Sequence, residues 1–338
     1  MFYKTIIKGT FDFGKEKTFE KIYKMAAHKV ENLYREAVCL DIEEAFDEEE
    51  FTFTVPRTVF NITEKYWKNT INLLEYLSQF AVVGRFYIWV IQDGQMIIKK
   101  ELEPNSEKNI VQYYLKGNRW MNEGNTDKAI ESYNKAIDKY AKHSMAYEKR
   151  GTINFQLKNF KDAIYDFNKS IKLYPQNGTA YFGLALALLK TGELEEAEKA
   201  LEQTAKKTIP HQNIYWKARR LRGKTLFELK QYEKALKEFS LISKRRFPKD
   251  DPVHAYVKYN HFMIGRCLFE MQRLGEAVNA LDKALEVNDG QNDKVSNGDI
   301  LLLKGKILRE LGDEKFLKVW KSAEELGNEK ATNLLKAL

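Results

Sequence analysis

The chain has 338 residues, of which 43% are hydrophobic and 13% aromatic, with only six prolines. This composition can bury a substantial core and excludes a disordered or collagen-like chain, and the length suits two domains or one domain plus repeats. The net charge of +8 is uneven: residues 1–105 hold 14 Lys and Arg against 17 Asp and Glu, and the remainder holds 42 against 31. The basic remainder therefore predicts an acidic partner.

The first residues, the most apolar stretch and the cysteines argue against a secreted, a membrane-spanning and a disulfide-rich or zinc-binding protein. The first residues carry Lys4 and Lys8 and lack the apolar run of a secretory signal, so we expect a cytoplasmic protein. The most apolar stretch, Leu73 to Ile91, is interrupted by charges and predicts no transmembrane segment. Cys39 and Cys267 are too few and too far apart for a disulfide framework or a zinc knuckle, and we expect buried thiols.

The first hundred residues alternate between strand and helix patterns. Aromatic and β-branched runs predict strands at 2–11 and 50–62, and two apolar runs within 84–102 flank an Asp93-Gly94 hairpin turn. Helical spacing is found from Lys15 to Glu36 and from Thr63 to Phe80, with Thr63 as the N-cap of the second helix.

This order predicts a small α+β domain over residues 1–105, possibly ferredoxin-like with an extra edge strand. The acidic run EEAFDEEE at 43–50 is expected at a turn between two strands, because six carboxylates in eight residues repel one another within a sheet. The run is either a solvated loop or an electrostatic ligand for the basic part of the same chain.

Residues 106–338 contain an internal repeat. Small residues head successive units at steps of 34, 34, 38, 42 and 40, namely Gly117, Gly151, Ala185, Gly223, Gly265 and Gly305. A second series steps by 34, 34, 38 and 42, namely Ala129, Ala163, Ala197, Ala235 and Ala277. Because the two series share increments, the added residues lie between units and leave the units intact.

Each unit is predicted to form two helices that approach closely at the small residues. Large residues recur four positions after each alanine as the packing partners, namely Tyr133, Phe167, Leu201, Phe239 and Leu281. One helical pair cannot bury its apolar face alone, so the units must stack.

The aromatic, Gly, Ala, aromatic and Pro positions resemble the W-x-x-L-G-x-x-Y, A-x-x-x-F and P pattern of the tetratricopeptide repeat (TPR) family. The resemblance covers five recognisable units and a degenerate sixth, in which Trp320 and Ala323 stand one residue early, followed by a capping helix. It implies a mainly α protein with a right-handed superhelical solenoid.

In that family the first helix of each unit lines a concave groove that binds another protein. The resemblance implies that the groove is lined by Tyr114, Asn118, Lys149, Phe155, Phe182, Lys217, Arg220, Lys224, Phe227, Phe262, Arg266, Phe269, Lys306 and Arg309. Its most basic part is the helix that carries Lys217, Arg220 and Lys224, which fall on one face at i, i+3 and i+7.

Some family members clamp a C-terminal carboxylate with an Asn and several Lys or Arg side chains spread over three units. Asn118 matches that pattern, but Tyr114, Lys149, Thr179 and Gly183 do not. We therefore expect an acidic ligand to favour the fourth to sixth units rather than this clamp.

No catalytic motif is present: the sequence lacks G-x-S-x-G, H-E-x-x-H, a P-loop and a dinucleotide fingerprint. His254 and His261 lack the companions of a metal site, so we expect no enzyme, cofactor or metal.

The first hypothesis is a non-enzymatic scaffold that binds an acidic, partly apolar peptide, with no membrane partner. The alternative is binding of nucleic acid, as RNA, through the basic solenoid and the run Lys244–Arg246.

Overall fold

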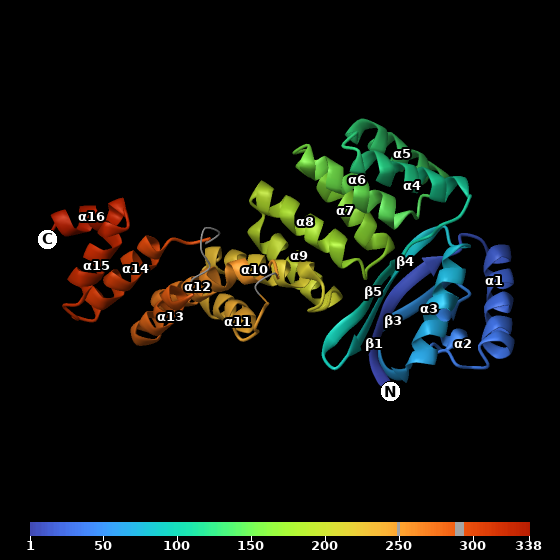
Figure 1. Cartoon of the computed structure of the whole chain (residues 1–338). Coiled ribbons are helices and arrows are strands. Elements are labelled where there is room, and N and C mark those ends of the chain that lie inside the picture. The colour runs from blue at the N-terminus through green and yellow to red at the C-terminus, as the bar shows by residue number, and fades with distance from the viewer. Residues whose placement is uncertain (249–250, 288–293) are drawn as a thin grey trace. The chain divides into compact units, whose positions relative to one another are not determined.

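The computed structural model describes residues 1–248, 251–287 and 294–338, and its elements are labelled in Figure 1. The chain divides into two compact units, Met1–Pro175 and Gln176–Leu338, each of which is described by itself. The change from sheet to repeats falls between the end of the last strand at Leu102 and the next helix at Asn109, inside the first unit.

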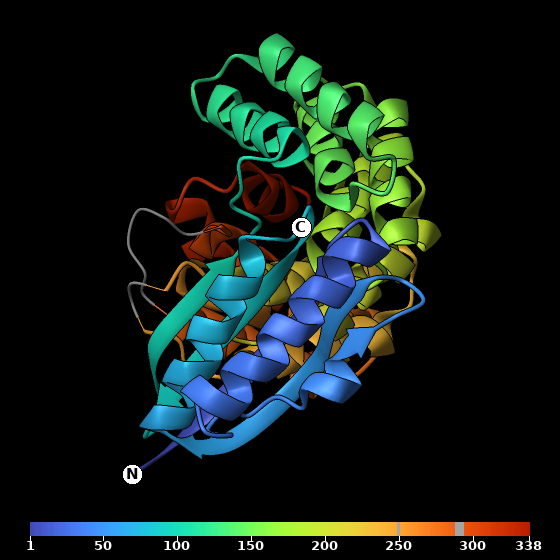
Figure 2. The ribbon, with the colours of Figure 1, turned by 90° about the vertical axis from the view of Figure 1, so that its right-hand side faces the viewer.

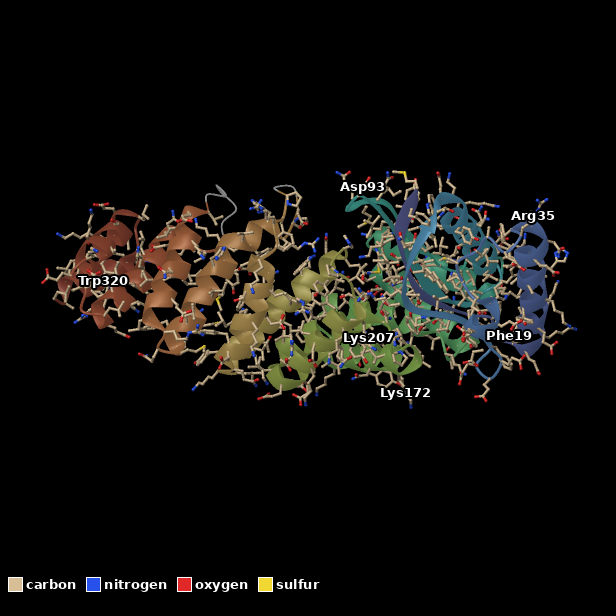
Figure 3. All side chains as sticks on the ribbon, turned by 90° about the horizontal axis from the view of Figure 1, so that it is seen from below. Phe19, Arg35, Asp93, Lys172, Lys207 and Trp320 are labelled. Atoms are coloured by element: carbon tan, nitrogen blue, oxygen red, sulfur yellow. The ribbon has the colours of Figure 1, made fainter. Side chains whose placement is uncertain are left out.

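A five-stranded antiparallel sheet forms the first part of unit 1. Its strands are β1 (Phe2–Asp12), β2 (Phe46–Asp47), β3 (Thr52–Thr63), β4 (Val83–Gln92) and β5 (Gln95–Leu102), in the spatial order β2-β3-β1-β4-β5. The predicted hairpin is confirmed: Asp93, labelled in Figure 3, and Gly94 have φ values of 49° and 80°, as a type I′ turn requires.

Helices α1 (Glu16–His28) and α3 (Glu64–Ser78) cover one face of this sheet (Figure 2). Phe11, Phe53 and Phe86 lie fully buried between the sheet and the helices. The first four strands and the two helices follow the order and sheet topology of a ferredoxin-like fold, with β5 as the extra edge strand. The predicted fold class is therefore confirmed.

The details at the helix ends differ from the predictions. The helix predicted from Lys15 to Glu36 ends at His28, because one π-helical turn (Lys29–Leu33) and left-handed residues at Arg35 and Glu36 follow it. Thr63 occupies the N-cap position of α3 but makes no side-chain capping hydrogen bond.

Only the end of the acidic run lies in a turn between two strands, as the sequence predicts. The run begins in a short helix, α2 (Ile42–Ala45), passes through β2 and ends in the turn before β3. Asp47 holds this turn, because its carboxylate accepts hydrogen bonds from the backbone N–H groups of Glu49 and Glu50.

Two helical pairs complete unit 1 and pack against the sheet domain. They are α4 (Asn109–Asn122) with α5 (Thr126–Lys139), and α6 (Ser144–Gln156) with α7 (Phe160–Leu173). Val82 and Val83 of the sheet domain share one buried cluster with Tyr133 and Met145 of the repeats. The Tyr140 hydroxyl also donates a hydrogen bond of 2.6 Å to Asp12, so the sheet domain and these repeats form one packed body.

Unit 2 consists of four further helical pairs and a terminal helix. The pairs are α8 (Gly178–Thr191) with α9 (Leu194–Lys207), α10 (Asn213–Glu228) with α11 (Tyr232–Ser243), α12 (Val257–Glu270) with α13 (Leu274–Glu286), and α14 (Asn297–Glu310) with α15 (Phe316–Glu325). The terminal helix α16 (Glu329–Lys336) packs Ala331 against the same cluster as Trp320, in the position predicted for a cap.

The small residues lie where the paired helices touch, as predicted. A Cβ atom added to Gly117 would lie 2.5 Å from the Tyr133 ring, and one added to Gly223 would lie 2.9 Å from the Phe239 ring. In the degenerate unit Trp320, labelled in Figure 3, covers Gly305 in the same way although it stands one residue early. The repeat register read from the sequence is therefore confirmed by these contacts.

Candidate functional site

Helix α10 divides its cations between two faces. Arg219 and Arg222 are neutralised within unit 2, since Arg219 pairs with Glu238 at 2.8 Å and Arg222 pairs with both Glu238 and Glu198. Lys217 and Lys224 are exposed, and the spacing i, i+3 and i+7 places Arg220 on their face. This second face is the cationic surface that a partner can reach.

A pocket of about 300 Å³ lies beside this cationic face. Lys217 and Arg220 line it from α10, with Trp216 next to them, and Tyr256 closes it from the segment before α12. The Arg220 guanidinium lies 3.5 Å from the centroid of the Tyr256 ring. Burial lowers the pKa of Arg220, but the pKa of arginine is so high that the group stays charged at neutral pH.

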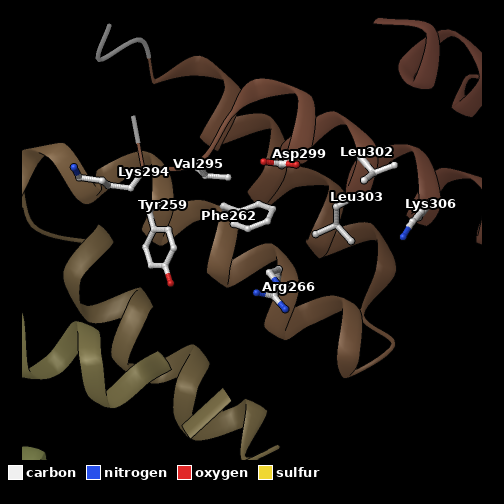
Figure 4. Close-up of a pocket in the computed structure, with 9 residues that line it drawn as sticks. All are labelled: Tyr259, Phe262, Arg266, Lys294, Val295, Asp299, Leu302, Leu303 and Lys306. Atoms are coloured by element: carbon white, nitrogen blue, oxygen red, sulfur yellow. The ribbon is translucent and has the colours of Figure 1, made fainter. Parts of the chain in front are cut away.

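A second pocket, of about 390 Å³, lies between α12 and α14 (Figure 4). From α12 it is lined by Tyr259, Phe262 and Arg266, which follow the same i, i+3 and i+7 spacing as the cations of α10. The Arg266 guanidinium lies 4.4 Å from the ring centroid of Phe227 and 5.9 Å from that of Phe262. Helix α14 contributes Asp299, Leu302, Leu303 and Lys306.

The two pockets adjoin, because Lys294 lines both. Among the described residues that line them are five cations, Lys217, Arg220, Arg266, Lys294 and Lys306, and one carboxylate, Asp299. Asp299 is engaged inside the protein, since its carboxylate accepts hydrogen bonds from Ser296 and Asn328. We call these two pockets together the basic double pocket.

The structure brings five of the fourteen predicted groove residues into the double pocket: Lys217, Arg220, Phe262, Arg266 and Lys306. Phe227 adjoins it through its contact with Arg266, and Lys224 and Arg309 are exposed on α10 and α14. Phe269 and Phe182 are half-buried on α12 and α8.

The four predicted residues of unit 1 have other surroundings. Lys149 is half-buried, Phe155 packs on Phe160, and Asn118 accepts a hydrogen bond of 2.8 Å from the Tyr133 hydroxyl. Tyr114 requires a correction. It is only 2% exposed and its hydroxyl faces Glu103 at 3.4 Å, so the packing of the sheet domain on α4 removes it from any groove.

Four important lining residues were not predicted: Trp216, Tyr256, Tyr259 and Lys294. Tyr259 could have been found, since it lies three residues before Phe262 and seven before Arg266 on the same face. Tyr256 and Lys294 lie in segments between helical pairs, outside the repeated pattern, so helical spacing gives no signal for them.

The described residues offer little for catalysis or metal binding. No group of three or more His, Cys, Asp and Glu side chains among them could hold a metal ion. Burial raises the pKa of Cys39 to about 11 and that of Cys267 to about 12, so both thiols stay protonated at neutral pH. Within the same residues no helix is both long and apolar enough to span a bilayer.

Comparison with known proteins agrees with the repeat geometry. Tetratricopeptide repeat models match residues 114–178, 154–218 and 260–290. A TPR repeat-containing protein of Methanocaldococcus jannaschii is 32% identical over 157 residues, which cover 44% of this chain and 27% of that protein. Heat shock protein STI1 of Saccharomyces cerevisiae is 36% identical over 99 residues, 28% of this chain and 17% of that protein. The matches thus span less than a third of these curated relatives.

Among solved structures, YrrB, described as a TPR protein with an unusual peptide-binding site, aligns with a TM-score of 0.51 at 19% identity. The alignment covers 62% of this chain and all of that chain, and at this identity it shows a shared fold. The periodic small residues, their contacts inside each helical pair and the family matches lead to one conclusion: the chain is a tetratricopeptide repeat protein with an α+β domain ahead of its repeats.

Proposed function

We propose that this chain is a non-enzymatic interaction scaffold, and that the basic double pocket binds an acidic, partly apolar segment of a partner protein. The observation that carries the proposal is the concentration of five cations and several aromatic rings around two adjoining pockets on α10, α12 and α14. The peptide-binding site described for YrrB, which has the same fold, supports it.

The chemistry of the double pocket fits such a ligand. Arg220 and Arg266 are each held against aromatic rings, so little side-chain freedom is lost when they meet a carboxylate. Phe262 and Leu303 offer apolar surface to a neighbouring side chain of the ligand. Alternating acidic and apolar residues in the ligand satisfy both kinds of contact.

A defined probe tests the proposal. A fluorescein-labelled peptide, EEFEELF with both ends blocked, is expected to bind the full chain, and the reversed-charge peptide KKFKKLF is not. Replacing Lys217→Glu and Lys306→Glu together should weaken binding by roughly tenfold or more, because two attractive charges become repulsive.

The matched control carries the same change of charge at Lys199→Glu and Lys237→Glu, exposed residues of α9 and α11 that do not line the pockets. Fluorescence anisotropy of the peptide with both double variants gives the comparison. Equal weakening in the two variants would reduce the effect to net charge and contradict the assignment of the site.

Nucleic acid remains the second candidate ligand, and one observation favours it. Lys244, Arg245 and Arg246 are exposed after α11, and Arg245 lies 5.3 Å from the ring centroid of Trp216 beside the double pocket. The salt dependence of binding distinguishes the candidates. The affinity for a nucleic acid held through about six phosphates should fall roughly 10³-fold between 50 and 200 mM salt, and the affinity for a peptide held partly by apolar contacts should fall less. A fluorescein-labelled single-stranded RNA titrated beside the peptide measures this difference.

A further inference from the structure

The outer edge of β3 has almost no strand beside it. On its inner side β3 pairs with β1 over nearly its whole length, from Phe2 opposite Thr63 to Asp12 opposite Thr52. On its outer side β2 pairs only with Thr52 and Phe53. In the described residues, the outward N–H and C=O groups of β3 beyond Phe53 therefore have no strand partner.

A pocket of about 330 Å³ lies along this edge, beside the α2 segment that leads into β2. One wall comes from the α2 segment and the other from β3, so the pocket lies where an edge strand would continue the line of β2. Its lining side chains include Leu40, Glu44, Ala45, Val55, Thr58 and Phe60.

The rim of this pocket carries two carboxylates, Asp41 and Glu44, and no Lys or Arg among the described lining residues. Both belong to a segment, residues 37–56, that contains seven carboxylates and is followed by Arg57 of β3. Glu43, Glu44, Glu48 and Glu49 are exposed, and Glu50 forms an ion pair of 3.1 Å with Lys142. The charge of this rim is thus opposite to that of the basic double pocket.

We propose that the β3 edge accepts an extended segment of a partner protein as an added strand, and that this segment alternates Lys or Arg with Val or Ile. The unpaired backbone groups supply the hydrogen bonds, the pocket takes an apolar side chain, and the acidic rim selects cations. Pro56 has no N–H to donate, so pairing runs along Arg57–Thr63.

A second copy of this chain fits the edge less well than such a partner. Strand β3 contains Arg57 but no carboxylate, so its own sequence offers one cation to the rim of another copy. Pairing two β3 edges would also bring two acidic rims together, and like charges at an interface disfavour association.

The test uses the full chain and the blocked, fluorescein-labelled peptide KVKVKVK. Two control peptides are EVEVEVE, which reverses the charge, and KVKPKVK, which cannot complete strand pairing because of its proline. We expect KVKVKVK to bind more tightly than either control. We also expect hydrogen exchange to slow in fragments covering residues 54–63, whose outward amides are unpaired in the free protein.

The variant that tests the rim is Glu43→Lys with Glu44→Lys, both exposed, which should weaken peptide binding roughly tenfold. Its matched control is Glu107→Lys with Glu123→Lys, exposed residues of the same unit outside the pocket, which should bind nearly as the parent does.

Several results would overturn the proposal. The first is failure of KVKVKVK to bind the full chain, and equal loss of binding in the two double variants would count in the same way. The second is binding of KVKVKVK without slower hydrogen exchange at residues 54–63, because the peptide would then be held by charge alone and not as an added strand. The third is a concentration-dependent dimer that protects residues 54–63 without peptide, which would assign the edge to a second copy.

Discussion

His143 is a buried histidine that caps a helix. It is 1% exposed, lies against the Tyr114 ring, and its Nδ1 atom accepts a hydrogen bond from the backbone N–H of Ala146. Burial lowers the pKa of His143 from 6.5 to about 3. One repeat later Asn177 caps α8 in the same way, with its side chain accepting from the N–H of Ala180.

This geometry makes unit 1 sensitive to acid. Below pH 6.5 the unfolded chain protonates His143 and the folded chain does not until about pH 3, so the free energy of unfolding falls by about 1.4 kcal/mol per pH unit within that window. At neutral pH His143 is uncharged in both the folded and the unfolded chain, so none of this stability is lost.

The variant His143→Asn keeps a capping side chain, as Asn177 does in the next repeat, and removes the titrating group. Its stability should therefore fall less between pH 6.5 and 4.5 than that of the parent, although a smaller side chain makes it less stable at pH 7. Denaturant unfolding of both proteins at several pH values measures the difference. Parallel curves would show that His143 does not titrate as described.

The turns inside the repeats contain residues in the left-handed region. Gly192 has φ 88° at the end of α8, and Lys158 and Lys230 occupy the equivalent turns with φ 64° and 57°. Side chains other than glycine are strained there. Lys158→Gly should stabilise the protein by up to about 1 kcal/mol, and Gly192→Ala should destabilise it by a similar amount. Thermal unfolding should show a higher melting temperature for Lys158→Gly and a lower one for Gly192→Ala. Shifts in the same direction would contradict the role given to the left-handed turn.

At the scale of one helix, the two faces of α10 should respond differently to mutation. Arg222 is 18% exposed and pairs with Glu198 and Glu238, whereas Lys224 is 56% exposed and pairs loosely with Glu228 at 3.7 Å. Arg222→Ala leaves the partly buried carboxylates without this cation and should cost about 3 kcal/mol. Lys224→Ala should stay within about 0.5 kcal/mol of the parent. If denaturant unfolding showed the same loss of stability in both variants, the division of α10 into a paired and an exposed cationic face would be wrong.

The packing of a helical pair leaves no room at the alanine positions. Ala163 is fully buried on α7, and Gly151 of α6 lies against Phe167, four residues further along the same helix. Ala163→Leu should therefore overpack the pair and cost about 1 to 3 kcal/mol. A control with Leu at the exposed Lys161 of the same helix should unfold nearly as the parent does. An unchanged melting temperature for Ala163→Leu would contradict the register of the repeat.

The elements were predictable where a residue pattern repeats. The spacing from Gly117 onward predicts every helical pair, because each small residue is followed by a large one sixteen positions later, or fifteen in the degenerate unit. The glycines of this series lie against those large residues. The site was predictable only in part. Helical spacing finds Lys217, Arg220 and Arg266, but Tyr256 and Lys294 come from irregular segments that obey no period. The burial of Tyr114 depends on packing of the sheet domain, whose Val82 and Val83 lie in the same buried cluster, and helical spacing gives no signal for that contact.

At the scale of the whole molecule, one buried cation joins the sheet domain to the repeats. Arg85 of β4 is 7% exposed, pairs with Glu103 at 2.7 Å, and lies 3.7 Å from Glu148 of α6. Arg85→Met would leave these carboxylates without their cation and should destabilise unit 1 by about 3 kcal/mol.

Hydrogen exchange locates that effect. Exchange should accelerate in the sheet and in α4 to α7, and helices α12 to α15 of unit 2 should exchange as in the parent, because repeats contact mainly their neighbours. Uniform acceleration along the chain would show that the two units unfold together.

The segments that lengthen the repeat steps to 42 and 40 residues supply Val253, Tyr256, Lys294 and Val295 to the double pocket. These residues lie between helical pairs, outside the glycine and alanine contacts that hold each pair together. The lining of the double pocket can therefore be changed without changing the contacts that hold the helical pairs together. The same separation makes the two segments transplantable: inserted between the pairs of another tetratricopeptide array, they should carry part of the ligand preference proposed here without a redesign of its core.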